Sequence, residues 1–208
     1  MKATSYSSKD AERHAKKMRK IKAARDKMME NKTEKKGLII VNTGAGKGKS
    51  SSGFGMILRC IGNDMQSAVV QFIKGTWQTG EREFLEKRFQ KECIFIVSGE
   101  GFTWETQNRE LDISAAKSGW EIAKELIRNS EIKFILLDEI YIALRYDYLD
   151  INEVVDFLLH EKPFLTHVVL TGRNAKDELI EAADLVTEMS LIKHPFRDGI
   201  KAQKGIEF

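Results

Sequence analysis

The chain has 208 residues, 42% of them hydrophobic, and a formal net charge of +3. This length suits one sizeable α/β domain, which would bury roughly 70% of its unfolded surface. No apolar run approaches the ~20 residues that a membrane-spanning helix needs, and the charged N-terminus lacks the apolar block of a signal peptide. We therefore expect a cytoplasmic protein that does not bind membranes.

The charge is divided unevenly along the chain. Residues 1–36 hold 13 Lys and Arg against 5 Asp and Glu, a net +8 that leaves −5 for the remainder. Apolar residues recur every three or four positions in this basic arm, which predicts a helix with one weakly apolar stripe. The arm is either a solvated, partly disordered segment or a helix that covers an anionic ligand or a partner subunit. Acidic residues interrupt its basic run and Tyr6 is its only aromatic residue, which disfavours nucleic acid binding.

Strand and helix patterns alternate from Gly37 onward, which predicts right-handed crossovers and a mostly parallel sheet with helices on both faces. The expected domain is residues 37–208. Asp150 with Glu153 resembles a capping box, and Asn174 is a candidate N-cap. We expect strands at residues 38–42, 67–73, 93–97, 133–138, 167–171 and 185–189. We expect helices at about 50–62, 80–90, 112–129, 151–161 and 175–183.

The two cysteines, Cys60 and Cys93, lie in apolar segments with helix and strand patterns. Such positions are typical of buried free thiols and not of a disulfide or a metal site. This cysteine usage again indicates the cytoplasm.

The most informative stretch is LIIVNTGAGKGKS at residues 38–50. Its apolar start predicts a buried strand, three glycines predict a loop, and the segment from Ser50 has helical spacing that Gly62 ends. Strand, glycine loop, Gly-Lys-Ser and helix are typical of a phosphate-binding loop, where backbone N–H groups and the helix N-terminus attract anions. Lys49 can reach phosphate oxygens, and the Ser50 hydroxyl can bind magnesium.

This phosphate loop departs from the usual spacing at Thr43, which stands five residues before Gly48, where glycine is usual. It also carries an extra cation, Lys47. The alternative, a plain glycine-rich turn, is weakened because a strand and a helix flank the loop as the motif requires. We therefore predict a triphosphate site, while the pattern alone leaves its reaction open.

The second informative feature of the sequence is a pair of acidic residues at the end of an expected strand. Another apolar strand, residues 134–137, leads directly into Asp138 and Glu139. Phosphate-loop enzymes use acidic residues at a strand end to hold magnesium, directly or through water. The alternative is two solvated carboxylates, but in such sheets ligands bind at the carboxyl ends of the strands, beside the phosphate loop.

Two loops that follow expected strands carry aromatic residues, Trp77 in one and Phe102 with Trp104 in the other. These rings either plug the loops onto the core or form a flat apolar wall for a large planar ligand. Residues 193–199 follow the last strand and are rich in functional groups. Their His194 is either a surface histidine or a ligand contact.

The run GAGKGKS at residues 44–50 resembles the altered phosphate loop of ATP:corrinoid adenosyltransferases of the cobalamin-biosynthesis type. The run GFTWETQNR at residues 101–109 is similar to the same family and is much more specific than a phosphate loop. The resemblance covers residues 37–208 nearly end to end. Further similar runs are VQFIKGTW (70–77), LLDE (136–139), TGR (171–173) and KHPF (193–196). Mild departures from residues common in the family occur at Ala45, Ser50 and Pro195.

The resemblance implies a reaction in which cob(I)alamin or a related corrinoid attacks C5′ of ATP. The adenosyl group moves to cobalt and triphosphate leaves, in adenosylcobalamin biosynthesis or salvage. It also implies a reversed ATP, with the γ-phosphate where a kinase holds the β-phosphate, which the altered spacing at Thr43 fits. Mg²⁺ or Mn²⁺ held by Ser50 and Glu139 would help to neutralise the departing triphosphate. The implied nucleotide-binding residues are Gly44, Ala45, Gly46, Lys47, Gly48, Lys49, Ser50, Ser51, Arg59, Arg173 and His194.

Phe102 and Trp104 match family positions that fill the space below the corrin and expel the lower axial ligand of cob(II)alamin. Loss of that ligand eases reduction of the cobalt. Together with Lys49 they are the expected catalytic residues. The resemblance further implies a reduced flavoprotein as electron donor and a homodimer. It leaves open which corrinoid, which of the two metals and which donor the protein uses.

Two rival functions come from the residues themselves. A phosphotransferase or ATPase would act on the γ-phosphate and yield ADP, whereas the transferase yields free triphosphate. A nucleotide-regulated binding protein would use the basic arm on a macromolecule and show steeply salt-dependent binding.

Overall fold

The computed structural model describes residues 8–72, 79–98 and 109–207. Its contacts divide the chain into two compact units, Met1–Lys35 and Lys36–Phe208. Helix α1 (Ser8–Met29) makes up most of the described part of the first unit, which confirms the helix expected in the basic arm. The roles assigned to the arm and to the domain stay predictions. No helix within the described residues is long and apolar enough to cross a membrane.

The second unit is built on a six-stranded sheet with the order β3-β2-β4-β5-β1-β6. Neighbouring strands pair in parallel throughout. The central strands are continuous apolar runs because their side chains alternate between two cores, one on each face of the sheet. The predicted α/β fold is thereby confirmed. The strands are β1 (Ile39–Thr43), β2 (Ser67–Phe72), β3 (Cys93–Ser98), β4 (Phe134–Asp138), β5 (His167–Thr171) and β6 (Leu185–Glu188).

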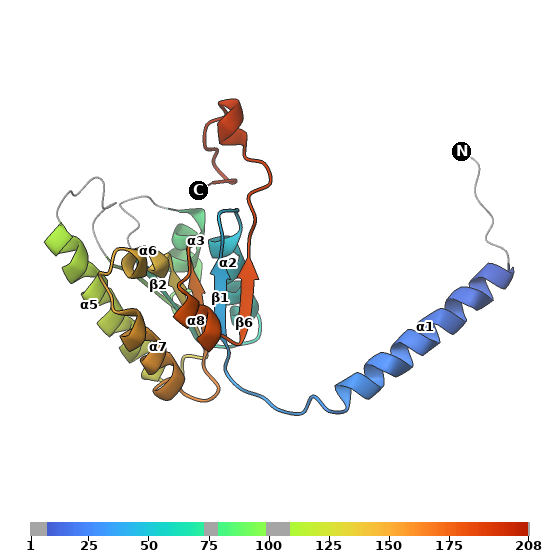
Figure 1. The fold of residues 1–208 in the computed structure, drawn as a ribbon. Coiled ribbons are helices and arrows are strands. Elements are labelled where there is room, and N and C mark those ends of the chain that lie inside the picture. Colours follow the sequence, from blue (N-terminus) through green and yellow to red (C-terminus); the bar gives the residue numbers. More distant parts are fainter. Residues whose placement is uncertain (1–7, 73–78, 99–108, 208) are drawn as a thin grey trace. The chain divides into compact units, whose positions relative to one another are not determined.

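Helices cover both faces of this sheet (Figure 1). On one face, α5 (Arg109–Arg128) and α7 (Ile151–His160) pack over the larger core, which includes Trp120 and Phe157. On the other face, α2 (Lys49–Ile61) and α3 (Gly80–Arg88) contribute Phe54, Ile57 and Leu85 to the smaller core. Within the described residues, the other elements are α6 (Ile140–Arg145), α8 (Asp177–Ala182) and the 3₁₀ helix η1 (Pro195–Asp198).

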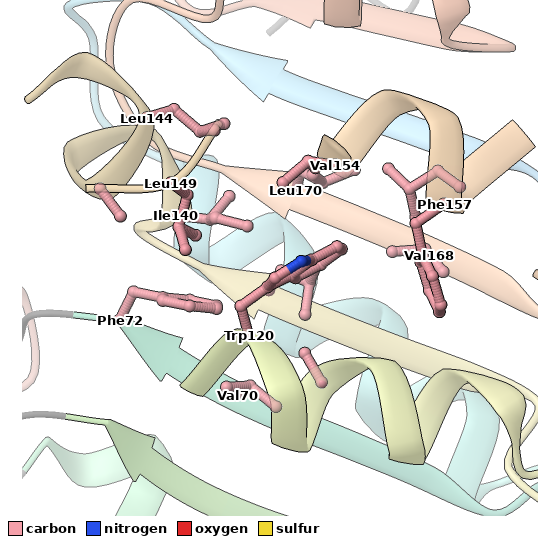
Figure 2. Close-up of a cluster of buried hydrophobic side chains, with 14 of the residues drawn as sticks. Val70, Phe72, Trp120, Ile140, Leu144, Leu149, Val154, Phe157, Val168 and Leu170 are labelled. Carbon is pink, nitrogen blue, oxygen red and sulfur yellow. The ribbon is translucent and has the colours of Figure 1, made fainter. Parts of the chain in front are cut away.

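Trp120 is the largest side chain that is fully buried in the larger core. Figure 2 shows its ring between β-strand residues such as Val70 and the helix residues Val154 and Phe157. The ring meets Phe157 edge to face at a centroid distance of 5.3 Å, and its Nε1–H donates to the Glu153 carboxylate at 2.9 Å. The indole therefore buries a large apolar area while its polar group keeps a partner.

The predicted element boundaries agree with the structure to within about three residues, but some local predictions were wrong. Asp150 caps α7 as predicted, accepting the Asn152 N–H at 2.8 Å, yet Glu153 binds Trp120 and closes no capping box. Asn174 is not the cap of α8, because Lys176 holds that position. Helix α6 was not predicted, since it follows β4 with no loop. Both cysteines are buried and free, as predicted.

A polar network closes the amino end of the sheet. The Lys162 ammonium donates to the carbonyls of Gly37 and Thr166 at 3.0 and 2.9 Å. The His167 ring nitrogen Nδ1 accepts the Leu38 N–H at 3.1 Å, which requires a neutral imidazole. Burial, reinforced by the Lys162 ammonium, holds the pKa of His167 below its usual range.

This network predicts a pH-dependent stability. Unfolded His167 takes up a proton near pH 6.5, whereas the folded ring stays neutral to lower pH. The free energy of unfolding should therefore fall as the pH drops below about 6.5, by up to about 1.4 kcal/mol per pH unit, until the folded ring also titrates. Urea denaturation between pH 7.5 and 5.5 measures this. His167→Gln, which can still accept the Leu38 N–H, should flatten the slope, while the exposed His160→Gln should not. Equal slopes in wild type and His167→Gln would contradict the assignment.

Candidate functional site

The phosphate loop joins β1 to α2. Thr43 is the last strand residue, and its hydroxyl accepts the Ala175 N–H at 3.0 Å, so it ties β1 to the segment before α8. Gly44 and Gly48 have φ of 103° and 108°, a region that favours glycine, and α2 begins at Lys49. The predicted strand, glycine loop and helix are thus present in the expected order.

The segment after β6 lies directly against this loop. The Gly46 N–H donates to the Met189 carbonyl at 2.6 Å, and the Met189 N–H donates to the Thr43 carbonyl at 2.8 Å. A Cβ atom on Gly46 would lie 2.6 Å from the Ser190 carbonyl oxygen. Gly46 is therefore required by close backbone packing, and its N–H serves the fold here and does not point to an open phosphate site.

A cavity of about 550 Å³ opens beside the loop. Three cations line it, Lys47, Lys49 and Arg173, and three carboxylate residues line it as well, Glu81, Glu139 and Glu207. Burial lowers the pKa of Lys49, with further lowering by the charges of Arg173 and Lys47, while Glu139 opposes this. Burial and then Arg173 likewise lower the pKa of Lys47. The three cations thus lie close enough to influence one another, and the Lys49 ammonium meanwhile donates to the Gly46 carbonyl.

The acidic pair at the end of β4 is divided between two roles. Asp138 is fully buried, and its carboxylate accepts from the Gln71 amide at 2.8 Å and from the Thr171 hydroxyl at 2.7 Å. Glu139 lines the cavity with Ser50, so the cavity carries a hydroxyl and a carboxylate, both donors of the kind that hard cations prefer. The described residues hold no cluster of three or more His, Cys, Asp or Glu that could bind a metal unaided. A metal here would depend on substrate phosphates for further ligands, as Mg²⁺ commonly does.

Helix α3 forms another wall of the cavity. Thr79 caps its N-terminus by accepting the Arg82 N–H at 3.4 Å. Glu81 and Phe84 line the cavity from the first turns of this helix, and Phe54 lines it from α2. The cavity therefore combines a cationic side with aromatic surface.

The C-terminal tail completes the lining, which the sequence analysis missed. Gly205, Ile206 and Glu207 line the cavity, and the Glu207 carboxylate pairs with the Lys47 ammonium. No periodic pattern or motif marks this tail, so nothing in the sequence predicted its place at the cavity. An internal carboxylate thus occupies the side of the loop where an anionic ligand is expected.

The structure brings together most of the predicted site residues but not all. Arg59 is exposed in the last turn of α2 and does not appear among the described cavity-lining residues. His194 is also absent from that lining, and its ring accepts the Phe196 N–H at 3.2 Å as the cap of η1. Phe102 and Trp104 lie outside the described residues. The predicted residues that line the cavity are Gly46, Lys47, Gly48, Lys49, Ser50, Ser51, Glu139 and Arg173, whereas Gly44 and Ala45 belong to the loop only.

A parallel sheet with a glycine loop, an adjoining helix N-terminus and a cavity at its carboxyl edge that three cations line defines a phosphate-loop nucleotide-binding protein. The family described as ATP:corrinoid adenosyltransferase BtuR/CobO/CobP matches residues 35–208, and a cob(I)alamin adenosyltransferase N-terminal region matches residues 3–29. The chain therefore belongs to the ATP:corrinoid adenosyltransferase family, as the sequence predicted.

Individual relatives agree with this assignment. A corrinoid adenosyltransferase from Sinorhizobium sp is 66% identical over 96% of this chain and 94% of its own length. Another from Pseudomonas aeruginosa is 47% identical over 95% of this chain and 96% of its own length. A third from Escherichia coli is 41% identical over 95% of this chain and 98% of its own length. The predicted transferase activity is confirmed, and the rival phosphotransferase and binding-protein interpretations are not supported.

The pairing of Lys47 with Glu207 predicts a competition at the loop. Glu207→Gln should tighten the binding of inorganic triphosphate about two- to five-fold, the range expected for loss of one partly exposed ion pair. Isothermal titration calorimetry measures this affinity directly. Glu161→Gln, which removes the exposed ion pair with Arg128 elsewhere, is the matched control and should have no effect. Unchanged or weaker binding in Glu207→Gln would contradict a competing role for the tail.

Proposed function

We propose that the cavity beside the phosphate loop binds the triphosphate of ATP as a leaving group and directs C5′ towards a reduced corrinoid. The observation that carries this proposal is the convergence of three cations, Lys47, Lys49 and Arg173, around one cavity beside the phosphate loop, which three carboxylates also line. A polyanion is the ligand that pairs with such a group of cations, and a divalent cation bound with it would offset the carboxylates.

The reaction makes one bond and breaks one. The electron pair of cobalt(I) forms the bond to C5′ of ATP, and the C5′–O bond breaks. Its electron pair leaves on the triphosphate, whose negative charge grows as the bond lengthens. Cations that already surround that oxygen-rich group stabilise the developing charge without reorganising. We assign this role to Lys49 first, because it is buried beside the loop, and then to Lys47 and Arg173.

Ser50 and Glu139 are the residues that we propose would hold Mg²⁺ or Mn²⁺. Both line the cavity, and both present the hard oxygen donors that these ions prefer. A bound divalent ion would add charge neutralisation at the triphosphate. Ser51 and the loop residues Gly44, Ala45, Gly46 and Gly48 would shape the phosphate surface around it.

The resemblance supports several further assignments to this chain. We propose that Phe102 and Trp104 displace the lower axial ligand of cob(II)alamin, so that a reduced flavoprotein can deliver the electron. Arg59 and His194 are proposed to approach the nucleotide, although they do not line the cavity among the described residues. A homodimer and a cytoplasmic location complete the proposal.

The decisive test of the reaction is product identification. ATP and chemically reduced cobalamin should yield adenosylcobalamin and free triphosphate, and ADP as the product would contradict the proposal. Lys49→Ala should slow this reaction by about 10²–10³-fold, the cost of removing one charge-stabilising donor. Lys91→Ala, an exposed lysine just before β3, is the control. Thermal unfolding of each variant shows whether the fold is intact, and near-normal turnover in Lys49→Ala would remove this lysine from the mechanism.

The aromatic pair makes a separate prediction. Phe102→Ala or Trp104→Ala should lower the rate from cob(II)alamin and a protein reductant at least about tenfold more than the rate from chemically reduced cobalamin, a difference of about 1.4 kcal/mol. Cobalt(I) carries no lower ligand, so it bypasses the displacement. Phe164→Ala, an exposed aromatic residue on the same domain, should affect neither assay. Equal losses in both assays, with the four-coordinate cob(II)alamin signal still present, would exclude the displacement role.

A further inference from the structure

Gln71 is a buried polar residue that the proposed reaction does not use. It is 1% exposed near the carboxyl end of β2, in the run that resembles the family. Its strand neighbours Val70 and Phe72 belong to the larger core, where Figure 2 shows them near Trp120. Because strand side chains alternate, Gln71 points to the opposite face, where α2 and the phosphate loop lie.

Adjacent strands place matching polar residues on that same face. Gln71 pairs in register with Asp138 of β4, and Thr171 of β5 pairs in register with Asn42 of β1. Their neighbours Leu137 and Leu170 face the larger core, so these residues also point towards the phosphate-loop side. All four side chains are at most 3% exposed. The strand ends therefore carry a buried polar row beneath the loop.

Hydrogen bonds connect this row to Glu139. The Gln71 amide donates to one oxygen of Asp138 at 2.8 Å, and the Thr171 hydroxyl donates to the other at 2.7 Å. The same Thr171 oxygen accepts the Glu139 backbone N–H at 3.1 Å. With both carboxylate oxygens bonded, Asp138 has a single orientation, and it in turn fixes the hydroxyl that accepts from Glu139.

Glu139 needs such support because of its backbone. Its φ of 59° and ψ of 23° place it in the left-handed region, which residues other than glycine adopt at a cost. This conformation turns the chain abruptly from β4 into α6. Glu139 lines the cavity, whereas Asp138 is absent from its described lining.

We propose that Gln71, Asp138 and Thr171 are positioning residues that hold Glu139 in its cavity-facing conformation and thereby set the affinity for the divalent cation. The proposal rests on the proposed function, which gives Glu139 to that cation. Outer partners of this kind orient a metal ligand without touching the metal.

Thr171→Val tests the proposal because valine has nearly the shape of threonine but neither donates nor accepts. The readout is Mn²⁺ affinity, measured by electron paramagnetic resonance on the full chain with ATP present. We expect Thr171→Val to weaken Mn²⁺ binding at least about tenfold, the usual effect of removing an outer partner. Metal-free ATP binding should change less than about twofold, because Thr171 is buried and is absent from the described lining of the cavity, so the contacts to ATP are kept. Thr171→Ser keeps the hydroxyl and should restore the wild-type Mn²⁺ affinity.

Thr166→Val is the matched control. Thr166 is 1% exposed just before the amino end of β5, where its hydroxyl donates to the Ile132 carbonyl at 3.4 Å. It should leave Mn²⁺ affinity unchanged, and an equal loss in this variant would overturn the proposal. If Thr171→Val does not fold, Gln71→Met carries the test, since it removes one hydrogen bond at nearly constant volume. Unchanged Mn²⁺ affinity in the folded variant would also overturn the proposal.

Glu139→Gln separates this inference from the function beneath it. Weaker Mn²⁺ binding in Glu139→Gln together with weaker binding in Thr171→Val supports both. Weaker binding in Glu139→Gln alone overturns the positioning role and leaves the metal assignment standing. Unchanged binding in Glu139→Gln overturns the metal assignment itself, and the positioning role with it.

Discussion

Repulsion among Lys47, Lys49 and Arg173 is the constraint on which the site depends. Burial first, and the neighbouring cations after it, lower the pKa of both lysines, so each ammonium is less favoured here than in water. The protein offers partial relief through the Gly46 carbonyl and the Glu207 carboxylate. A triphosphate carries more negative charge than either of these groups. When it binds, Lys47 and Lys49 therefore exchange weak internal partners for a stronger external one.

The fold maintains this repulsion through backbone packing, and the glycine loop shows how. The Met189 and Ser190 carbonyls come so close to Gly44 and Gly46 that a Cβ atom on either glycine would clash. The segment that follows β6 therefore holds the loop in place through these close backbone contacts. Because the loop cannot move away, Lys49 at the first position of α2 stays near Lys47 and Arg173. Rigid backbone of this kind keeps charges in place before the substrate arrives.

Much of this arrangement could be predicted from the sequence. Continuous apolar runs predicted the central strands, and three glycines with a lysine and a serine predicted the loop. Helix α6 was not predicted, because only Glu139 separates it from β4 and its six residues are too few to show a helical period. The tail at Glu207 was missed because its place depends on a contact 160 residues away in sequence, with Lys47. Gln71 lies in a run that resembles the family, but its role needs the register with Asp138, which no local pattern contains.

The polar row explains how one sheet serves both stability and chemistry. Apolar residues at the positions of Gln71, Asp138 and Thr171 would remove the buried polar side chains and leave the Glu139 N–H without its Thr171 acceptor. Buried polar networks are nevertheless often no more stable than apolar packing. Asn42 even leaves its Nδ2–H₂ without a partner among the described residues, which costs about 1–3 kcal/mol for a buried donor. The row is therefore poorly accounted for by stability alone. Its members occur where the strands end beneath the phosphate loop. At that point the side chains on one face of the sheet belong to the larger core, and those on the other face belong to the site.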